Sequence, residues 1–235
     1  MDILNRIDTS INHLLKIDKL SSVFDHLNYD EWFHDEIEKN HTQSRCVFLR
    51  LWESEQHAIV LGRSNSPKVE TFEEKSLKDN IPIIKRCSGG GTVLLGPGCL
   101  CYTLFIPTHL ETCNTIQKTN HYVMNTHKDS LSLCLPNISV QGHTDLCIDN
   151  VKFSGNSQRR KKHWILFHGT FLYNYDLSII DRYLKHPSKE PSYRKARQHL
   201  SFLKNCPLPK ETLSTSLSSA WNCQSDLEIP LYKSF

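Results

Sequence analysis

The sequence lacks the patterns that mark a membrane-spanning, secreted or zinc-binding protein. No stretch approaches the roughly 18 consecutive apolar residues that a membrane-spanning helix needs. The first residues, MDILNRIDTSINHLL, have no basic flank before an apolar core, so we expect no secretory signal. The nine cysteines are odd in number, irregularly spaced and never arranged as C-x-x-C, which argues against a disulfide framework and a zinc knuckle. These absences favour a cytoplasmic setting.

Net charge is also small. The chain has 28 Lys+Arg against 25 Asp+Glu, a formal net charge of +3, which is too balanced for a dedicated nucleic-acid-binding protein. One basic run, QRRKKHW at 158–164, nevertheless has the chemistry of a patch for nucleic acid or for an acidic protein surface. The 235 residues, with 38% hydrophobic and 23% charged side chains, fit one large globular domain or two small ones.

Apolar periodicity predicts both helices and strands. Helices are expected over 3–39, 68–80, 111–135, 176–184 and 192–203, and strands over 45–52, 57–62, 81–87, 99–106, 138–149, 151–158 and 163–173. Short polar connections predict hairpins between the first two strands and around Asp149-Asn150. The Ser-, Thr- and Pro-rich tail from Asn205 is expected to hold one short helix at most. The pattern favours an α+β domain whose mixed, largely antiparallel sheet is flanked by helices.

Three successive glycines follow Arg86 closely in IKRCSGGGTVLLGPG. Gly89, Gly90 and Gly91 allow backbone N–H groups to face a ligand directly, and Arg86 at the loop entrance suits a phosphate or carboxylate. The phosphate loop that ends in Gly-Lys-Ser/Thr and the dinucleotide fingerprint are both excluded, because β-prone TVLL follows the glycines. From this loop alone, a glycine-lined hairpin with a solvated arginine remains an alternative.

Two further segments carry candidate site residues. Lys152 stands between Val151 and Phe153 in a predicted strand, so burial of those neighbours would direct Lys152 to the opposite face. A lysine in a pocket beside a glycine loop suits negative charge on a phosphate or carbonyl oxygen, whereas a solvated edge-strand lysine is the alternative. His168, Gly169 and Thr170 interrupt an apolar strand, and a glycine there often marks close approach by a ligand; a hydrogen-bonded core histidine is the alternative for His168.

Four blocks of the sequence occur in an order and spacing that carry a family resemblance. They are LGRSNSPKVE (61–70), IPIIKRCSGGGTV (81–93), TDLCIDNVKFSGNSQRR (144–160) and FHGTFLYNYDL (167–177). Together they resemble the lipoate–protein ligase family, part of the biotin/lipoate ligase and octanoyltransferase superfamily, from about residue 30 to 205. The resemblance implies a catalytic-domain fold of the class II synthetase type, formed by residues 1–235 as a single domain without an accessory C-terminal domain.

The resemblance also implies a two-step reaction. The carboxylate of lipoate attacks the α-phosphate of ATP, and a lysine of a carrier domain then attacks the resulting lipoyl-adenylate to form an amide. ATP, Mg²⁺ and lipoate are therefore implied as substrates and cofactor, with no permanently bound prosthetic group. Lipoyl domains of 2-oxoacid dehydrogenase E2 subunits or the glycine-cleavage H protein are the implied partners, with a separate accessory subunit as a further candidate and neither nucleic acid nor membrane.

The same resemblance assigns roles to individual residues. Lys152 is implied as the catalytic residue, placed between the acyl carbonyl and the phosphate, and Asp145 is implied to position magnesium or substrate. The implied substrate and ATP contacts are Asn65, Arg86, Ser88, Gly89, Gly90, Gly91, Thr92, Val93, Leu94, Asp145, Lys152, His168, Gly169 and Thr170. The chain departs from the family pattern on the ligand-facing edge of the loop, at Cys87, Leu95, Gly96 and Cys99.

Three other interpretations remain open within this superfamily. An octanoyl or lipoyl transferase would need a cysteine nucleophile and no ATP; Asn137 stands where that cysteine is expected, with Cys134 and Cys147 nearby. A catalytically degenerate lipoyl-domain binder is consistent with the departures in the loop. A biotin ligase is less consistent, because the basic residues inside that branch's glycine loop are missing here.

Overall fold

The computed structural model describes residues 7–17, 20, 22–39 and 44–229. Its main sheet has eight strands in the order β11-β1-β2-β6-β10-β9-β8-β7. These strands are β1 (Asn12–Lys16), β2 (Phe48–Trp52), β6 (Cys99–Pro107), β7 (Ile138–Gln141), β8 (Asp145–Ile148), β9 (Val151–Arg160), β10 (Trp164–Leu172) and β11 (Cys223–Glu228). Only β1 pairs in parallel, with β2 and with β11, so the sheet is mixed and mostly antiparallel.

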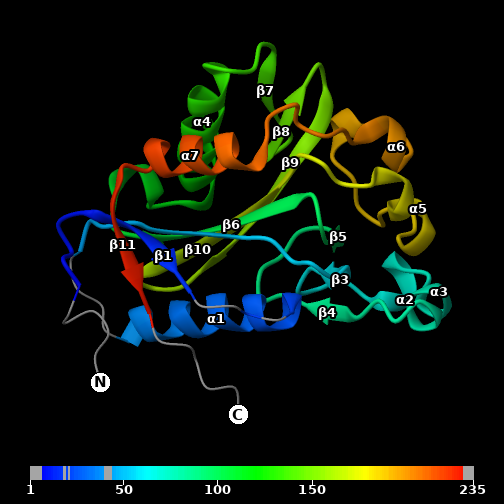
Figure 1. The fold of residues 1–235 in the computed structure, drawn as a ribbon, viewed down its shortest axis with the longest axis horizontal. Coiled ribbons are helices and arrows are strands. Elements are labelled where there is room, and N and C mark those ends of the chain that lie inside the picture. Colours follow the sequence, from blue (N-terminus) through cyan, green and yellow to red (C-terminus); the bar gives the residue numbers. More distant parts are fainter. Residues whose placement is uncertain (1–6, 18–19, 21, 40–43, 230–235) are drawn as a thin grey trace.

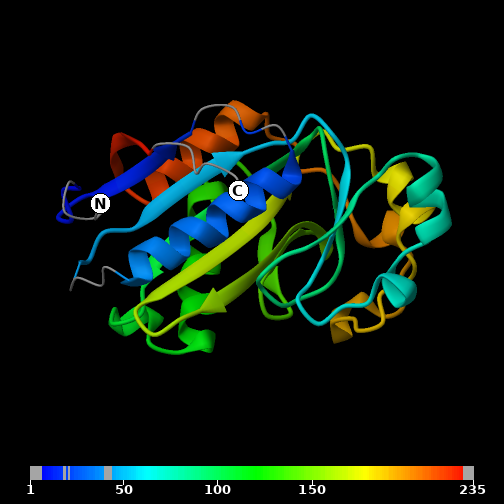
Figure 2. The same cartoon turned by 90° about the horizontal axis from the view of Figure 1, so that it is seen from below.

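Helices cover both faces of this sheet, with α1 on one side and α4 and α7 on the other (Figure 1, Figure 2). The α-helices are α1 (Val23–Lys39), α2 (Pro67–Glu70), α3 (Glu73–Lys78), α4 (Ile116–Ser132), α5 (Ile180–Tyr183), α6 (His199–Phe202) and α7 (Lys210–Ala220). Short 3₁₀ helices are η2 (Glu111–Cys113), η3 (Leu177–Ile179) and η4 (Ser192–Arg194). The expected α+β architecture is confirmed.

Strand alternation divides the core between the two faces. On β2, Phe48 packs with α1 whereas its neighbour Leu49 packs with α4 and α7. On β6, Phe105 and Leu104 divide in the same way. Because both faces are covered, every residue of β6 is buried, which explains the continuous apolar run of its sequence.

A smaller sheet carries the glycine loop. It consists of β4 (Ile83–Lys85), β3 (Ala58–Leu61) and β5 (Val93–Leu95), in that spatial order. The loop connects β4 to β5, and both strands pair with β3. The same three strands pack against the start of β6 and against α5 through a separate apolar cluster, which fixes the loop over the main sheet.

Two expectations about the N-terminal half were wrong. A helix over 3–39 is wrong in part: residues 12–16 form β1, because their alternating burial inserts His13 and Leu15 beside β2, while residues 1–6 lie outside the described part. The hairpin of 45–52 with 57–62 does not form, because β2 joins the main sheet and β3 the small one. The turn at Asp149-Asn150 is confirmed, with φ of 52° and 62°.

Three helical expectations also changed. The helix over 68–80 divides at Thr71, which forms a bridge with Leu184. The helix over 192–203 divides because Lys195 and Ala196 adopt positive φ, which no right-handed helix accommodates. The tail after Asn205 is more ordered than expected: α7 packs on the sheet, and β11 adds an edge strand.

Candidate active site

The glycine loop is held in shape by its own arginine. Arg86 is 9% exposed, and its guanidinium donates to Ser88 Oγ at 3.0 Å, Val60 O at 3.3 Å, Gly89 O at 2.6 Å and Gly91 O at 2.8 Å. Burial lowers the pKa of Arg86 to about 10, so it stays protonated at neutral pH. Its donors therefore point at the loop itself, and its assignment to phosphate oxygens stays a prediction.

Neighbouring strands anchor the same loop. Ser88 Oγ donates to Nε2 of His168 on β10 at 2.5 Å, and Ser157 Oγ on β9 donates to Gly89 O at 2.9 Å. Burial lowers the pKa of His168 to about 3, so its imidazole is neutral and Nε2 can accept that proton. His168 thus links the loop to the main sheet as a hydrogen-bond acceptor.

Lys152 reaches into the space beside this loop. Its Nζ lies 2.8 Å from Asp145 Oδ1, and the other carboxylate oxygen of Asp145 accepts from Tyr193 Oη at 2.7 Å. Phe153 is fully buried in the core under α4, as strand alternation predicted, whereas Val151 is only half-buried. The Lys152 amine is therefore fixed by a hydrogen-bonded carboxylate instead of being free in solvent.

One cavity of about 890 Å³ brings these groups together. It is lined by every residue that the sequence predicted for the site except Ser88 and Gly89. Its volume is in the usual range for small-molecule sites. The cavity also has an apolar part, formed by Leu27, Trp52, Val60, Leu95, Cys99, Cys101, Leu172, Ile180 and Leu184. A ligand with an apolar tail and an anionic head matches this division.

Residues 22–206 match the family model described as the lipoyl protein ligase A/B catalytic domain. The chain belongs to this family. It is 31% identical over 156 residues to a probable lipoate-protein ligase A of Mycoplasma genitalium. The aligned region covers 66% of the chain and 44% of the relative. It is 30% identical over 171 residues to lipoate-protein ligase A of Blochmanniella floridana, covering 69% of the chain and 48% of the relative. The chain thus spans about half the length of these curated relatives.

Solved structures of lipoate ligases share the fold. One is a bi-partite lipoate protein ligase studied with its E2 lipoyl domain from Thermoplasma acidophilum, with a TM-score of 0.76, 16% identity and coverage of 94% of this chain and 88% of that one. Another is a lipoate-protein ligase A bound with ATP, with a TM-score of 0.68, 17% identity and coverage of 95% and 89%. The expected ligase-type catalytic-domain fold is therefore confirmed.

Sequence reasoning missed one wall of the ligase-family cavity. The segment from Lys185 to Leu203 contributes lining residues that include Glu190, Arg194 and Phe202, and its Tyr193 supports Asp145 from behind the lining. It is tied to the opposite side through Ser188 Oγ, which donates to the buried carboxylate of Glu70. The signal was present in EPSYRKARQHLSF, where basic and aromatic residues interleave, but the segment was interpreted only as a helix.

The residues at which the chain departs from the family pattern pack against their neighbours in the structure. Leu95 is 4% exposed in the small-sheet core and also lines the cavity. At Gly96 an added Cβ would lie 2.3 Å from Cδ2 of His57, so the His57 ring occupies the space a longer residue would need. Cys87 packs at the α1 core, and burial raises the pKa of its thiol. The changed loop edge is therefore a packed surface.

Neither cysteine proposed as a nucleophile lines the cavity. Cys147 is fully buried, donates to Tyr193 Oη at 3.7 Å, and has its pKa raised by burial. Cys134 is exposed in the turn after α4. Cys99 and Cys101, which the sequence interpretation did not single out as nucleophiles, do face the cavity, and burial raises the pKa of Cys101 well above its usual range. A thiol held neutral is a poor nucleophile.

The basic run at 158–164 lies outside this cavity. Two of the four cations in this run pair with α1: Arg159 with Glu31, and Lys161 with Asp35. Across the described ranges, no cluster of His, Cys, Asp or Glu could hold a metal ion, and no described helix is long and apolar enough to cross a membrane.

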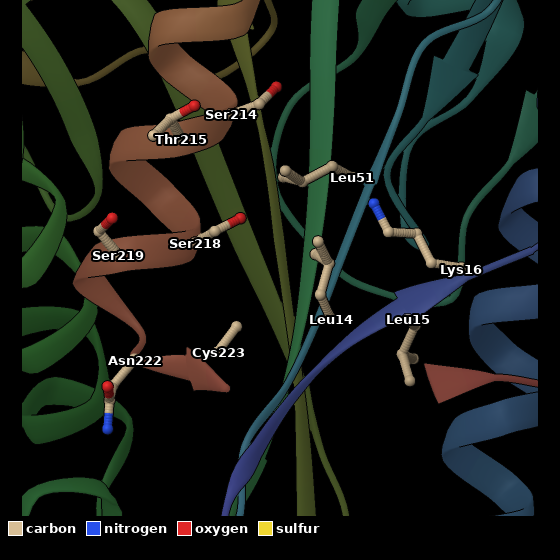
Figure 3. Close-up of a pocket in the computed structure, with 10 residues that line it drawn as sticks. All are labelled: Leu14, Leu15, Lys16, Leu51, Ser214, Thr215, Ser218, Ser219, Asn222 and Cys223. Carbon is tan, nitrogen blue, oxygen red and sulfur yellow. The ribbon is translucent and has the colours of Figure 1, made fainter. Parts of the chain in front are cut away.

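A second hollow of about 650 Å³ lies between α7 and strands β1 and β2 (Figure 3). Its lining includes Leu14, Leu51 and serines of α7. It contains none of the residues that the sequence predicted for the site.

Proposed function

We propose that the chain is a lipoate–protein ligase that activates lipoate with ATP and transfers the lipoyl group to a lysine of a carrier lipoyl domain. Membership of the family, the names of its relatives and the apolar-plus-cationic cavity support this activity. The observation that carries it is the position of Lys152, whose amine enters the cavity beside the glycine loop while its carboxylate partner is fixed by Tyr193.

Lys152 would act by electrostatic stabilisation. In both steps negative charge develops at the bond between the acyl carbonyl and the α-phosphate, and a preorganised ammonium at that position stabilises the transition state more than the ground state. Asp145 aims the amine, because its Oδ1 lies 2.8 Å from the Lys152 Nζ. Arg86 would contribute by maintaining the loop that contacts the adenylate.

The remaining assignments follow the two parts of the cavity. The apolar part around Trp52 and Leu172 would take the aliphatic tail of lipoate, and the glycine loop with Thr92 would contact the nucleotide. ATP would enter with Mg²⁺, which usually binds through substrate phosphates and one or two carboxylates. Asp145 lines the cavity and pairs with Lys152, and it is our candidate for the carboxylate that would contact Mg²⁺.

The ATP-independent transferase is less well supported. It requires an activated thiol that reaches the acyl group. Cys134 and Cys147 do not line the cavity, and the pKa of Cys101 is raised by burial, opposite to activation. A binder without catalysis would have no need for the Lys152–Asp145–Tyr193 arrangement.

One assay separates these functions. The protein is mixed with a lipoyl domain, lipoate and Mg·ATP, and the mass of the domain is followed. A gain of one lipoyl group that depends on ATP supports ligation, and a gain from octanoylated donor without ATP indicates transfer. No gain with either substrate set, nor with synthetic lipoyl-adenylate, would exclude both activities and leave the binder.

A further inference from the structure

A buried cation with an unused donor lies at the cavity wall. Arg194 in η4 is 5% exposed and lines the cavity. Its Nε donates to Arg197 O at 3.0 Å and lies 3.5 Å from the Glu190 carboxylate, but its Nη2 is buried without any hydrogen-bond partner. Leaving a buried charged donor unsatisfied is costly, so such a group in a cavity wall indicates a ligand that completes it.

Further positive charge lies close to Arg194. Three cations gather around the ring of Phe202: the guanidinium of Arg194 at 4.6 Å from its centroid, that of Arg197 at 5.1 Å and the ammonium of Lys152 at 5.9 Å. Two carboxylates act on Arg194, and both have other partners: Glu190 accepts from the backbone N–H of Ala196 at 3.0 Å, and Asp181 lies 2.6 Å from Nδ1 of His199. Cations concentrated in a concave site attract an anion.

The two arginines of the cavity are used differently. All three nitrogens of the Arg86 guanidinium donate within the loop and its support, as described above. Arg194 keeps a donor free, and its planar fork matches the geometry of phosphate oxygens. Because Lys152 contacts the same aromatic ring, one phosphate beside that ring could meet both cations.

We propose that Arg194 binds the phosphate of the acyl-adenylate, next to Lys152. This assignment rests on the proposed function and specifies which part of the substrate the wall segment recognises. A phosphate is favoured over the lipoate carboxylate because it presents oxygens to both cations after activation, when the carboxylate has lost its charge.

The test compares affinities for lipoyl-adenylate and for lipoate, measured by calorimetry on the full chain. Arg194→Met keeps an unbranched apolar stem over Phe202 and should weaken adenylate binding by about 10- to 100-fold, the usual range for a hydrogen bond to a charged group. Lipoate binding should change less than about twofold. Arg194→Lys retains the charge but lacks the bidentate fork. Its affinity for lipoyl-adenylate should therefore lie between those of the wild type and Arg194→Met.

Arg197→Met is the matched control. Arg197 contacts the same ring, but its donors go to the backbone oxygens of Arg194, Asn150 and Tyr193, and it does not line the cavity. Its loss should lower the melting temperature without changing the ratio of the two affinities. If Arg194→Met is poorly folded, Arg194→Lys gives the same comparison.

The outcomes distinguish this inference from the proposed function. Unchanged adenylate affinity in both Arg194 variants, or an equal loss for lipoate, would overturn the phosphate assignment while wild-type transfer to the carrier still supports ligation. Wild-type protein that binds adenylate but transfers nothing would exclude ligation, and the Arg194 comparison would still decide the phosphate contact. Wild-type protein that binds no adenylate would overturn both.

Discussion

Replacement of Gly62 by alanine should displace the glycine loop as a whole. Gly62 directly follows β3, and a Cβ at this position would lie 2.1 Å from the carbonyl oxygen of Gly90 and 2.6 Å from Asn65 Oδ1. Ordinary contact begins near 3.4 Å, so the Gly90 carbonyl would have to retreat by about 1.3 Å. The neighbouring bond from Arg63 N–H to Ser88 O, at 2.8 Å, opposes that retreat because it ties the same two segments.

The expected cost is both structural and catalytic. Forcing a methyl group into a packed contact costs about 1–3 kcal/mol, and a displacement of about 1 Å at a reacting group can reduce the rate about 100-fold. We therefore expect Gly62→Ala to lose about 100-fold in kcat/KM for lipoylation of the carrier domain, with a lower melting temperature. Thermal unfolding and the mass assay measure the two effects.

A nearby glycine provides the stability control. A Cβ at Gly89 would meet no atom within 4 Å, so Gly89→Ala should leave the melting temperature close to that of the wild type. Gly62→Ala with wild-type kcat/KM and melting temperature would refute the contact between β3 and the loop. Equal melting-temperature losses in both variants would refute the steric argument, because only one of these positions is crowded.

Three further predictions concern the catalytic lysine, its support and the pH range. Lys152→Met should lower kcat by about 100- to 1,000-fold, the cost of one preorganised donor, and retained kcat would exclude its role. Tyr193→Phe removes the bond to Asp145 but keeps the ring, so kcat should fall by about tenfold with little change in melting temperature. Burial lowers the pKa of His26 and His127 to about 3 and of His34 to about 4, from an ordinary 6.5. Their neutral forms stabilise the fold fully above pH 6.5, and this contribution is lost as pH falls toward 4. At pH 5 the loss is about 2 kcal/mol each, comparable in sum with a typical total stability, so circular dichroism should show cooperative unfolding before pH 4. A native spectrum at pH 4 would contradict this.

The parts of the site that depend on a local sequence pattern could be predicted from the sequence. The glycine loop lies between short β-prone segments, and Lys152 alternates with an apolar neighbour, so both could be placed on strands without any tertiary information. The structure brings these segments to one cavity with His168. What the sequence did not show is that Arg86 faces inward, because the acceptors of its donors are backbone oxygens that have no sequence signature.

Other features depend on pairing between distant segments. Strand β1 pairs with β11, so Asn12 lies opposite Cys223. A local sequence pattern does not predict a contact between residues so far apart in the chain. The wall near Arg194 was missed for a related reason. Lys195 and Ala196 adopt positive φ although neither is a glycine, so a segment with helical composition becomes a loop that folds over Phe202.

The opposite use of two arginines explains how this cavity can attract an anion through a loop that is rich in carbonyl oxygens. A glycine loop presents both N–H and C=O groups, and exposed carbonyl oxygens would repel a phosphate. Arg86 engages the carbonyls of Gly89 and Gly91 and so removes two partial negative charges from the ligand's surroundings. Because the donors of Arg86 bind the protein's own oxygens, a second guanidinium is needed to bind the ligand. Arg194 has a buried donor, Nη2, without a hydrogen-bond partner and can take this role. The guanidiniums of Arg86 and Arg194 therefore have complementary roles, and their losses should have different effects. Loss of Arg86 should change the shape of the glycine loop, whereas loss of Arg194 should lower the affinity for the phosphate.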